Sequence, residues 1–67
     1  MNKTNIHVLP DPARGWVLCR EGDRHELSHH AHQSAALAAA RSLAVADGVE
    51  LGVHDREGRV ARRLRTL

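Results

Sequence analysis

Histidines form the densest group of potentially reactive side chains in this chain. His25, His29, His30 and His32 lie within eight residues. Imidazole nitrogens bind zinc, copper or nickel when three or four of them converge. Alternation along a strand places only His25 and His29 on one face, and no Cys-x-x-Cys or His-Glu-x-x-His spacing accompanies them. We therefore expect a polar edge whose positive charge grows as the pH falls, with no metal and no other cofactor.

Two further features resemble parts of catalytic sites. Cys19 could act as a thiolate nucleophile, and His54 stands beside Asp55 as in an Asp–His pair. A nucleophile also needs a base, an orienting partner and a concave pocket, and a small domain offers little concavity. Adjacent strand residues point to opposite faces, so we expect His54 to hydrogen-bond the turn that follows it. The sequence thus predicts no catalytic residue and no enzymatic activity.

The C-terminal segment carries a concentrated positive charge. Residues 1–55 have a net charge of −2, whereas residues 56–67 have a net charge of +4. Arginine is well suited to bidentate contacts with phosphate, so a nucleic-acid-binding site would use Arg56, Arg59, Arg62, Arg63 and Arg65. The same charges also suit a solvated edge strand that resists aggregation. Composition leaves both interpretations open.

The chain has few large apolar side chains with which to build a core. It has 67 residues, Trp16 is its only aromatic residue, and much of its apolar content is alanine. A chain of this length buries only about 60% of the surface that it exposes when unfolded. We expect one domain over residues 1–67, with residues 1–4 and 65–67 frayed, and a core that a second copy of the chain completes.

Five strands and one helix are expected around that core. Apolar runs predict strands over residues 6–9, 16–20, 25–30, 49–54 and 59–64, with a proline-rich turn at residues 10–12 ending the first. Trp16 should pack in the core, Gly52 indicates a bulge or a close backbone approach, and Val60 and Leu64 should point inward. The order β-β-β-α-β-β predicts an α+β fold, a small antiparallel sheet with one helix packed across it.

The helix has the clearest pattern. Its apolar face is predicted to consist of Ala36, Leu37, Ala40, Leu43 and Ala44. Gly48 is placed to end the helix in the left-handed conformation. At the other end Ser34 is a better capping residue than His32.

Targeting signals are absent from the sequence itself. The first five residues lack the apolar region of a signal peptide, and the mainly apolar stretch 35–46 is too short to cross a bilayer. A single cysteine excludes an internal disulfide. We expect a cytoplasmic protein with no membrane partner, and we identify no small-molecule substrate.

Nearly the whole chain, from Ile6 to about Arg62, resembles a bacterial family known as domain of unknown function family 2188. The resemblance is carried in order by Ile6-His7-Val8 with Pro10, Gly15-Trp16, Glu21-Gly22, the helix over residues 36–44, Val53-His54 and Gly58-Arg59-Val60. Two positions depart from the family pattern, His32 at the helix start and Cys19. The resemblance implies a small α+β domain that often stands alone, and it implies no established activity, substrate or catalytic residue.

Two functions therefore remain open. The leading one is a non-enzymatic interaction module that self-associates through a sheet edge or an apolar patch. The alternative is a nucleic-acid-binding module that uses the five C-terminal arginines.

Overall fold

Strands and one helix follow each other in the predicted order. The computed structural model describes residues 4–23 and 25–65. The elements are β1 (Ile6–Asp11), β2 (Gly15–Arg20), β3 (Glu26–His30), α1 (Gln33–Asp47), β4 (Leu51–His54) and β5 (Val60–Leu64). Every predicted element is therefore present, and the bounds differ only slightly from those expected.

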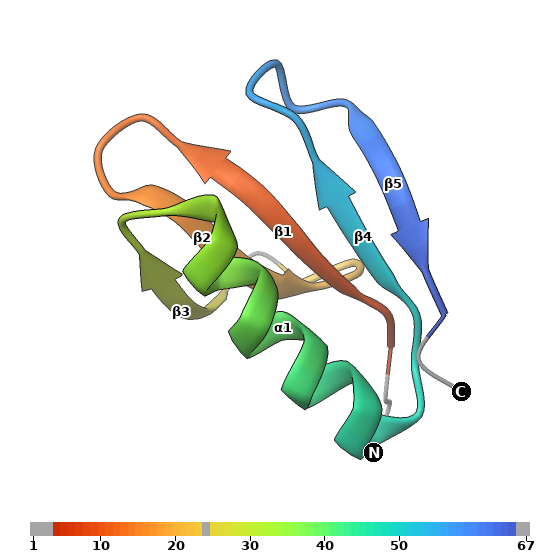
Figure 1. Ribbon diagram of the computed structural model, residues 1–67. Helices are drawn as coiled ribbons and strands as arrows, with labels where there is room; N and C mark the ends of the chain where they lie inside the picture. Colours follow the sequence, from red (N-terminus) through yellow and green to blue (C-terminus); the bar gives the residue numbers. More distant parts are fainter. Residues whose placement is uncertain (1–3, 24, 66–67) are drawn as a thin grey trace.

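The strands form one mixed sheet in the order β3-β2-β1-β4-β5 (Figure 1). Neighbouring strands are antiparallel except β1 and β4, which pair in parallel from Ile6 opposite Leu51 to Val8 opposite Val53. The helix between β3 and β4 returns the chain across the sheet, so β4 enters beside β1 in the same direction. The predicted α+β fold with one helix across a small sheet is confirmed, and its central strand pair is parallel.

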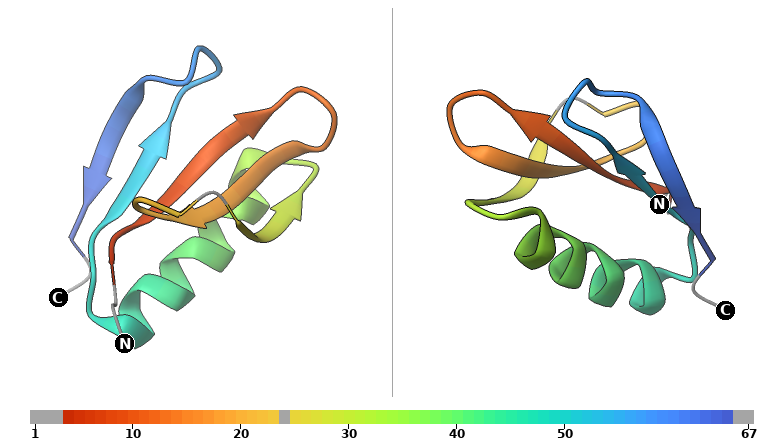
Figure 2. Two further views of the ribbon diagram at one scale, coloured as in Figure 1. Left: turned by 180° about the vertical axis from the view of Figure 1, so that it is seen from behind. Right: turned by 45° about the horizontal axis from the view of Figure 1, so that its top comes forward.

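Alanines form the contact between α1 and the sheet, and α1 lies along one face of that sheet (Figure 2). Ala36, Ala40 and Ala44 are fully buried and recur about once per helical turn. Their small side chains let the helix backbone lie close to the strands. The buried side chains of the sheet are larger: Ile6, Val8, Trp16, Leu18, Leu51 and Val53. This confirms the predicted helix face and the predicted core position of Trp16.

The two ends of α1 differ in how well they are capped. Gly48 has φ of 68° and ends the helix, with its N–H donating to the carbonyl of Val45 (3.3 Å). This left-handed cap confirms the prediction. The expected cap at Ser34 is wrong, because the helix begins at Gln33 and His32 is the N-cap, without a side-chain capping bond. Neither α1 nor any other helix among the described residues is long and apolar enough to span a membrane.

β1 continues through the proline-rich segment that was expected to end it. Pro10 lies in the strand opposite Trp16 of β2, and the strand ends at Asp11. On its other side β1 pairs with β4 only as far as Val8. Beyond Val8 that edge of β1 is open, so the missing N–H of Pro10 removes no bond to β4.

A bulge in the last hairpin changes which side chains of β5 face the helix side of the sheet. Arg62 lies opposite the buried Val53, and the register then shifts so that Val60 lies opposite His54. Val60 is 44% exposed, so its predicted inward position is wrong. Leu64, opposite Leu51, does pack against the core as expected.

The chain ends are described only in part. The predicted fraying of residues 1–4 and 65–67 stays a prediction, since residues 1–3 and 66–67 lie outside the described ranges. The carbonyl of Thr4 accepts a hydrogen bond from Arg20 (3.3 Å), which also pairs with Asp47 at the end of α1 (2.5 Å).

Substitution of the central helix alanine tests the core packing. Ala40→Glu places an unpaired carboxylate against the sheet, and we expect it to unfold the domain because burying such a charge costs several kilocalories per mole. Ala38→Glu is the matched control, since Ala38 is exposed on the same helix. Circular dichroism melts check both variants, and equal melting of Ala40→Glu and the wild type would contradict the assigned helix face.

Candidate functional site: the uncovered face of the sheet

One face of the sheet is left uncovered by α1. The helix packs along the opposite face, as the two views in Figure 2 show. Alternation along β1 sends Ile6 and Val8 toward the helix, and His7 and Leu9 away from it. We call the side on which His7 and Leu9 lie the uncovered face.

The centre of the uncovered face is apolar. Leu9 of β1 lies opposite Val17 of β2, and Val17 is only 8% exposed although it points away from the helix. Cys19 is half-buried beside them. Burial raises the pKa of the Cys19 thiol, and the charge of Asp23 raises it further. The thiol therefore behaves as a small apolar side chain at neutral pH, which is the opposite of an activated nucleophile.

Charged side chains border this apolar centre at the β1–β2 turn. Arg14 pairs with Glu26 of β3 and approaches Asp11 (3.5 Å). The Asp11 carboxylate also accepts the backbone N–H groups of Ala13 and Arg14, which lower its pKa. These contacts hold the turn in place.

Two histidines meet on the same face at the β1–β4 pair. His7 Nδ1 lies 3.0 Å from His54 Nε2, and His7 Nε2 lies 3.0 Å from a carboxylate oxygen of Glu21. At the far end His54 Nδ1 lies 2.9 Å from the carbonyl oxygen of Gly58. We call this row of Glu21, His7, His54 and the Gly58 carbonyl the histidine relay. Its last contact confirms the prediction that His54 bonds the following turn.

Gly52 makes room for the relay. It lies opposite His7 in the parallel pair, and a Cβ built on it would stand 2.8 Å from His7 Nδ1. The absence of a side chain lets the His7 ring lie across β4 and reach His54. Gly52 therefore marks a close approach, as its position in the strand predicted.

All four ring nitrogens of the relay have partners within it. In this arrangement the relay braces β1 against β4 and the turn that follows it. Three of its residues, His7, Glu21 and His54, line a depression of 390 Å³ together with Leu9 and Cys19. Across residues 4–23 and 25–65, no three or more His, Cys, Asp or Glu side chains are placed to hold a metal ion.

The histidines near β3 have separate neighbours. The His25 ring lies 2.9 Å from the Asp23 carboxylate. Hydrogen bonds from the backbone N–H and the ring of His25 lower the pKa of Asp23. His30 contacts Ser28 (3.0 Å), and His29 lies opposite Val17 across the strand pair. A bulge at Leu27 also breaks the alternation from which shared faces were predicted.

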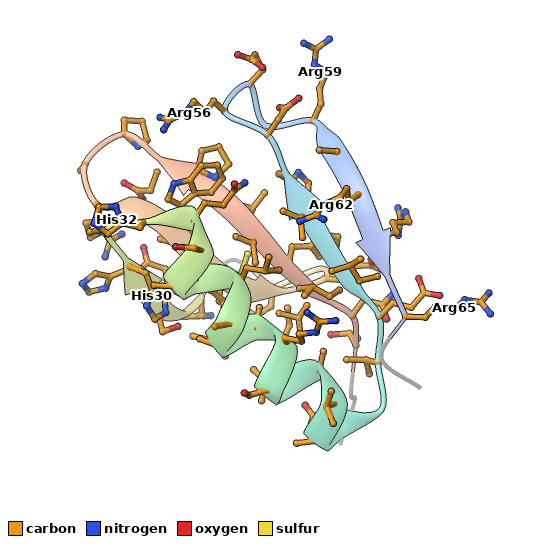
Figure 3. All side chains as sticks on the ribbon, viewed as in Figure 1. His30, His32, Arg56, Arg59, Arg62 and Arg65 are labelled. Atoms are coloured by element: carbon orange, nitrogen blue, oxygen red, sulfur yellow. The ribbon has the colours of Figure 1, made fainter. Side chains whose placement is uncertain are left out.

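The arginines of the predicted nucleic-acid site do not point in one direction, as Arg56, Arg59, Arg62 and Arg65 in Figure 3 show. Arg59 and Arg65 lie at opposite ends of β5, and both approach carboxylates. Arg59 lies 4.0 Å from Asp55 and 3.9 Å from Glu57. Arg65 lies 3.5 Å from Glu50. Register places Arg62 on the helix side of the sheet and Arg63 on the uncovered face. The five arginines therefore come from one strand and the residues beside it, but they do not form one continuous surface.

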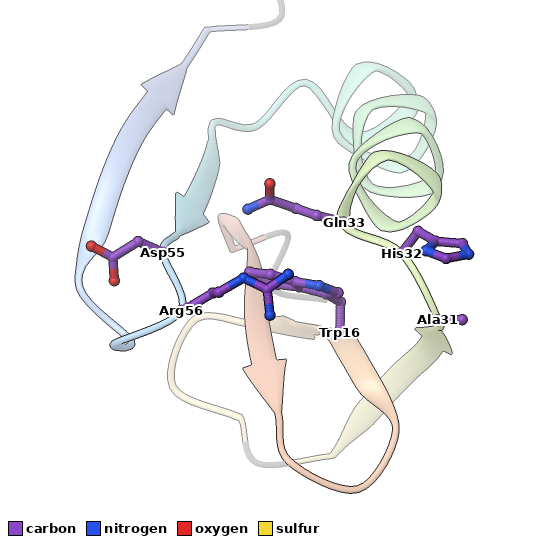
Figure 4. A pocket seen from close by; sticks show the side chains of 6 residues that line it. All are labelled: Trp16, Ala31, His32, Gln33, Asp55 and Arg56. Atoms are coloured by element: carbon purple, nitrogen blue, oxygen red, sulfur yellow. The ribbon is translucent and has the colours of Figure 1, made fainter.

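Arg56 lies apart from the others, at the end of the sheet beside the start of α1. Its side chain extends across Trp16 in a cleft of 260 Å³ (Figure 4). The remaining lining residues are Ala31, His32, Gln33 and Asp55. Trp16 is only 5% exposed, so it offers no open stacking surface.

The pairing of His7 with His54 was not predicted from the sequence. These residues are 47 positions apart, and only the parallel register of β1 and β4 brings them together. Gly52 was the one local signal of a close approach.

A methyl group at position 52 tests the relay geometry. Gly52→Ala should push the His7 ring aside and lower the free energy of unfolding by about 1–3 kcal/mol, the usual cost of overpacking. The control is the same substitution in a chain that lacks the His7 ring, the double variant His7→Ala, Gly52→Ala, compared with His7→Ala alone. Gly22→Ala is not suitable as a control, because Gly22 has a positive φ. The double variant removes the clashing ring, and the added methyl should then cost much less. Urea unfolding measures both, and an equal cost in the two backgrounds would contradict the geometry.

Comparison with known proteins gives a family and no activity. The family model described as an uncharacterized protein conserved in bacteria, domain of unknown function family 2188, matches residues 6–65. No curated protein and no solved structure gave a significant match. The match spans every strand and the helix described above. The chain therefore belongs to domain of unknown function family 2188.

Proposed function

We propose that this domain is a non-enzymatic interaction module that self-associates through the uncovered face of its sheet. The observation that carries the proposal is the apolar centre of that face, where the partly exposed Leu9 and Cys19 lie beside the buried Val17 with no helix over them. Apolar side chains gathered on one open sheet face gain free energy when a second surface covers them.

The size of the face predicts weak association. The whole molecule measures only 30 × 21 × 19 Å between Cα atoms, so one face of its sheet is small. A stable interface of standard size buries roughly 800 Å² on each partner. We therefore expect dissociation constants in the micromolar range, with Val60 at the β5 edge adding apolar area.

A second copy suits this face because the domain lacks a large core of its own. The buried helix side chains are all alanine, so each contributes little apolar area. Covering the second face of the sheet would add apolar contacts without changing the first. The non-enzymatic part of the proposal is supported by the contacts of the relay, in which every ring nitrogen of His7 and His54 already has a partner. The cytoplasmic location stays a prediction.

A charge at the centre of the uncovered face tests self-association. Leu9→Lys should shift the sedimentation profile toward monomer at concentrations where the wild type associates, because the dimer would bury two unpaired ammonium groups. Val45→Lys is the matched control, since Val45 is 58% exposed on the outer side of α1. Both variants are first shown to be folded by circular dichroism in dilute solution.

Two results would contradict the interface. One is a wild type that stays monomeric at high micromolar concentration. The other is dissociation by Val45→Lys and not by Leu9→Lys, which would move the contact to the helix.

A second candidate function is weak, sequence-independent nucleic-acid binding by β5 and its turn. The observation in its favour is that Arg62 and Arg63 have no ion-pair partner among the described residues. Neutralising about 3–5 phosphates would give a log–log salt slope of about −3 to −4.5 on duplex DNA. Arg62→Ala with Arg63→Ala should make that slope shallower by up to about two. No detectable binding to duplex or single-stranded nucleic acid at low salt would remove this candidate.

A further inference from the structure

The partners of the histidine relay determine how many protons it needs. Its three contacts run from the Glu21 carboxylate through His7 and His54 to the Gly58 carbonyl. An ionised carboxylate and a carbonyl oxygen are both acceptors, so the ring nitrogen at each end must carry a proton. The contact between the rings needs one more, on His7 Nδ1 or on His54 Nε2. Three protons therefore complete the relay, whereas two neutral imidazoles hold only two.

We propose that the relay is a proton-dependent brace between the two parts of the sheet. With three protons the two rings share one positive charge next to the negative charge of Glu21, and all three contacts are hydrogen bonds. When the third proton leaves, one contact must place two lone pairs against each other. That contact then opens and the brace is lost.

The position of the relay makes this loss matter for the fold. Strands β1, β2 and β3 form one antiparallel group, and β4 with β5 form a hairpin. Only the short parallel pairing of β1 with β4 joins the two within the sheet. The relay crosses that junction, from Glu21 at the end of β2 to the β4–β5 turn at Gly58.

Other charged groups around the relay come from three elements. Cys19 lies opposite His7 on β2, and Arg20 and Asp23 line the same depression. Arg20 pairs with Asp47 of α1, so its charge is compensated. From β5, Arg63 lies opposite Gly52 on the uncovered face. Glu21 is the acidic residue that contacts a ring of the relay, that of His7. Its carboxylate can only accept a hydrogen bond, and for this reason the relay needs the third proton.

Glu21→Gln separates this proton requirement from a general need for the histidines. The amide can donate its own N–H to His7 Nε2, so two neutral rings then satisfy all three contacts. Glu21 is 55% exposed at its side chain, so the variant should fold. His25→Gln is the control, because His25 is 94% exposed and lies outside the relay.

Melting temperature against pH in dilute solution provides the test. Between about pH 6 and about pH 8 the melting temperature of the wild type and of His25→Gln should fall relative to that of Glu21→Gln by roughly 4–8 °C, the shift that about one hydrogen bond produces in a domain of this size. The comparison is made relative to Glu21→Gln because the histidines of the unfolded chain lose protons over this range in every variant, and only the folded relay that contains Glu21 holds a third proton.

Ring ¹⁵N spectra give a second readout that a purely structural role of Glu21 would not produce. They should show three N–H protons on the two rings of the wild type at the acidic end and two in Glu21→Gln. Parallel melting profiles of wild type and Glu21→Gln would overturn the proposal, as would two neutral rings in the wild type throughout. Because the measurements use the dilute chain, their outcome is independent of self-association.

Discussion

The contact between the alanine face of α1 and one side of the sheet determines the rest of this structure. Small side chains at Ala36, Ala40 and Ala44 bring the helix close to the strands, and the larger buried residues all come from the sheet. One helix of this length can cover one face of the sheet only. The apolar residues of the other face consequently have no helix over them, and this is the physical basis of the proposed self-association.

The junction of β1 and β4 is the second constraint. Parallel pairing requires a long crossover, which α1 supplies, but the paired stretch ends at Val8 because β1 and β4 then diverge toward their own turns. The histidine relay lies across this short junction. A polar network at such a place stabilises the sheet only when each of its contacts has a proton between donor and acceptor.

Local patterns predicted much of the fold. The helix face followed from its periodicity, its end from Gly48, and the core position of Trp16 from strand alternation opposite an alanine-rich helix. Expectations failed where distant contacts override local preference. Pro10 is tolerated in β1 because β4 does not extend beside it, and His32 caps the helix with backbone groups alone.

Less of the candidate site could be predicted. Gly52 indicated a close approach, but nothing near it in sequence identifies His7 as the group that approaches. The arginines lie near the last hairpin as expected, and the faces that they occupy depend on the register between β4 and β5, including its shift between Val53 and His54. Register between segments far apart in the chain is the information that a single sequence lacks.

Intermolecular contacts of the uncovered face are the most direct measure of the central claim. An isotope-filtered NOE experiment on a mixture of labelled and unlabelled chains reports only contacts between copies. The account predicts intermolecular NOEs from the methyl groups of Leu9 and Val17, in the centre of the uncovered face. Intermolecular NOEs confined to Val45 on the outer side of α1, or none at a concentration where the chains associate, would contradict it.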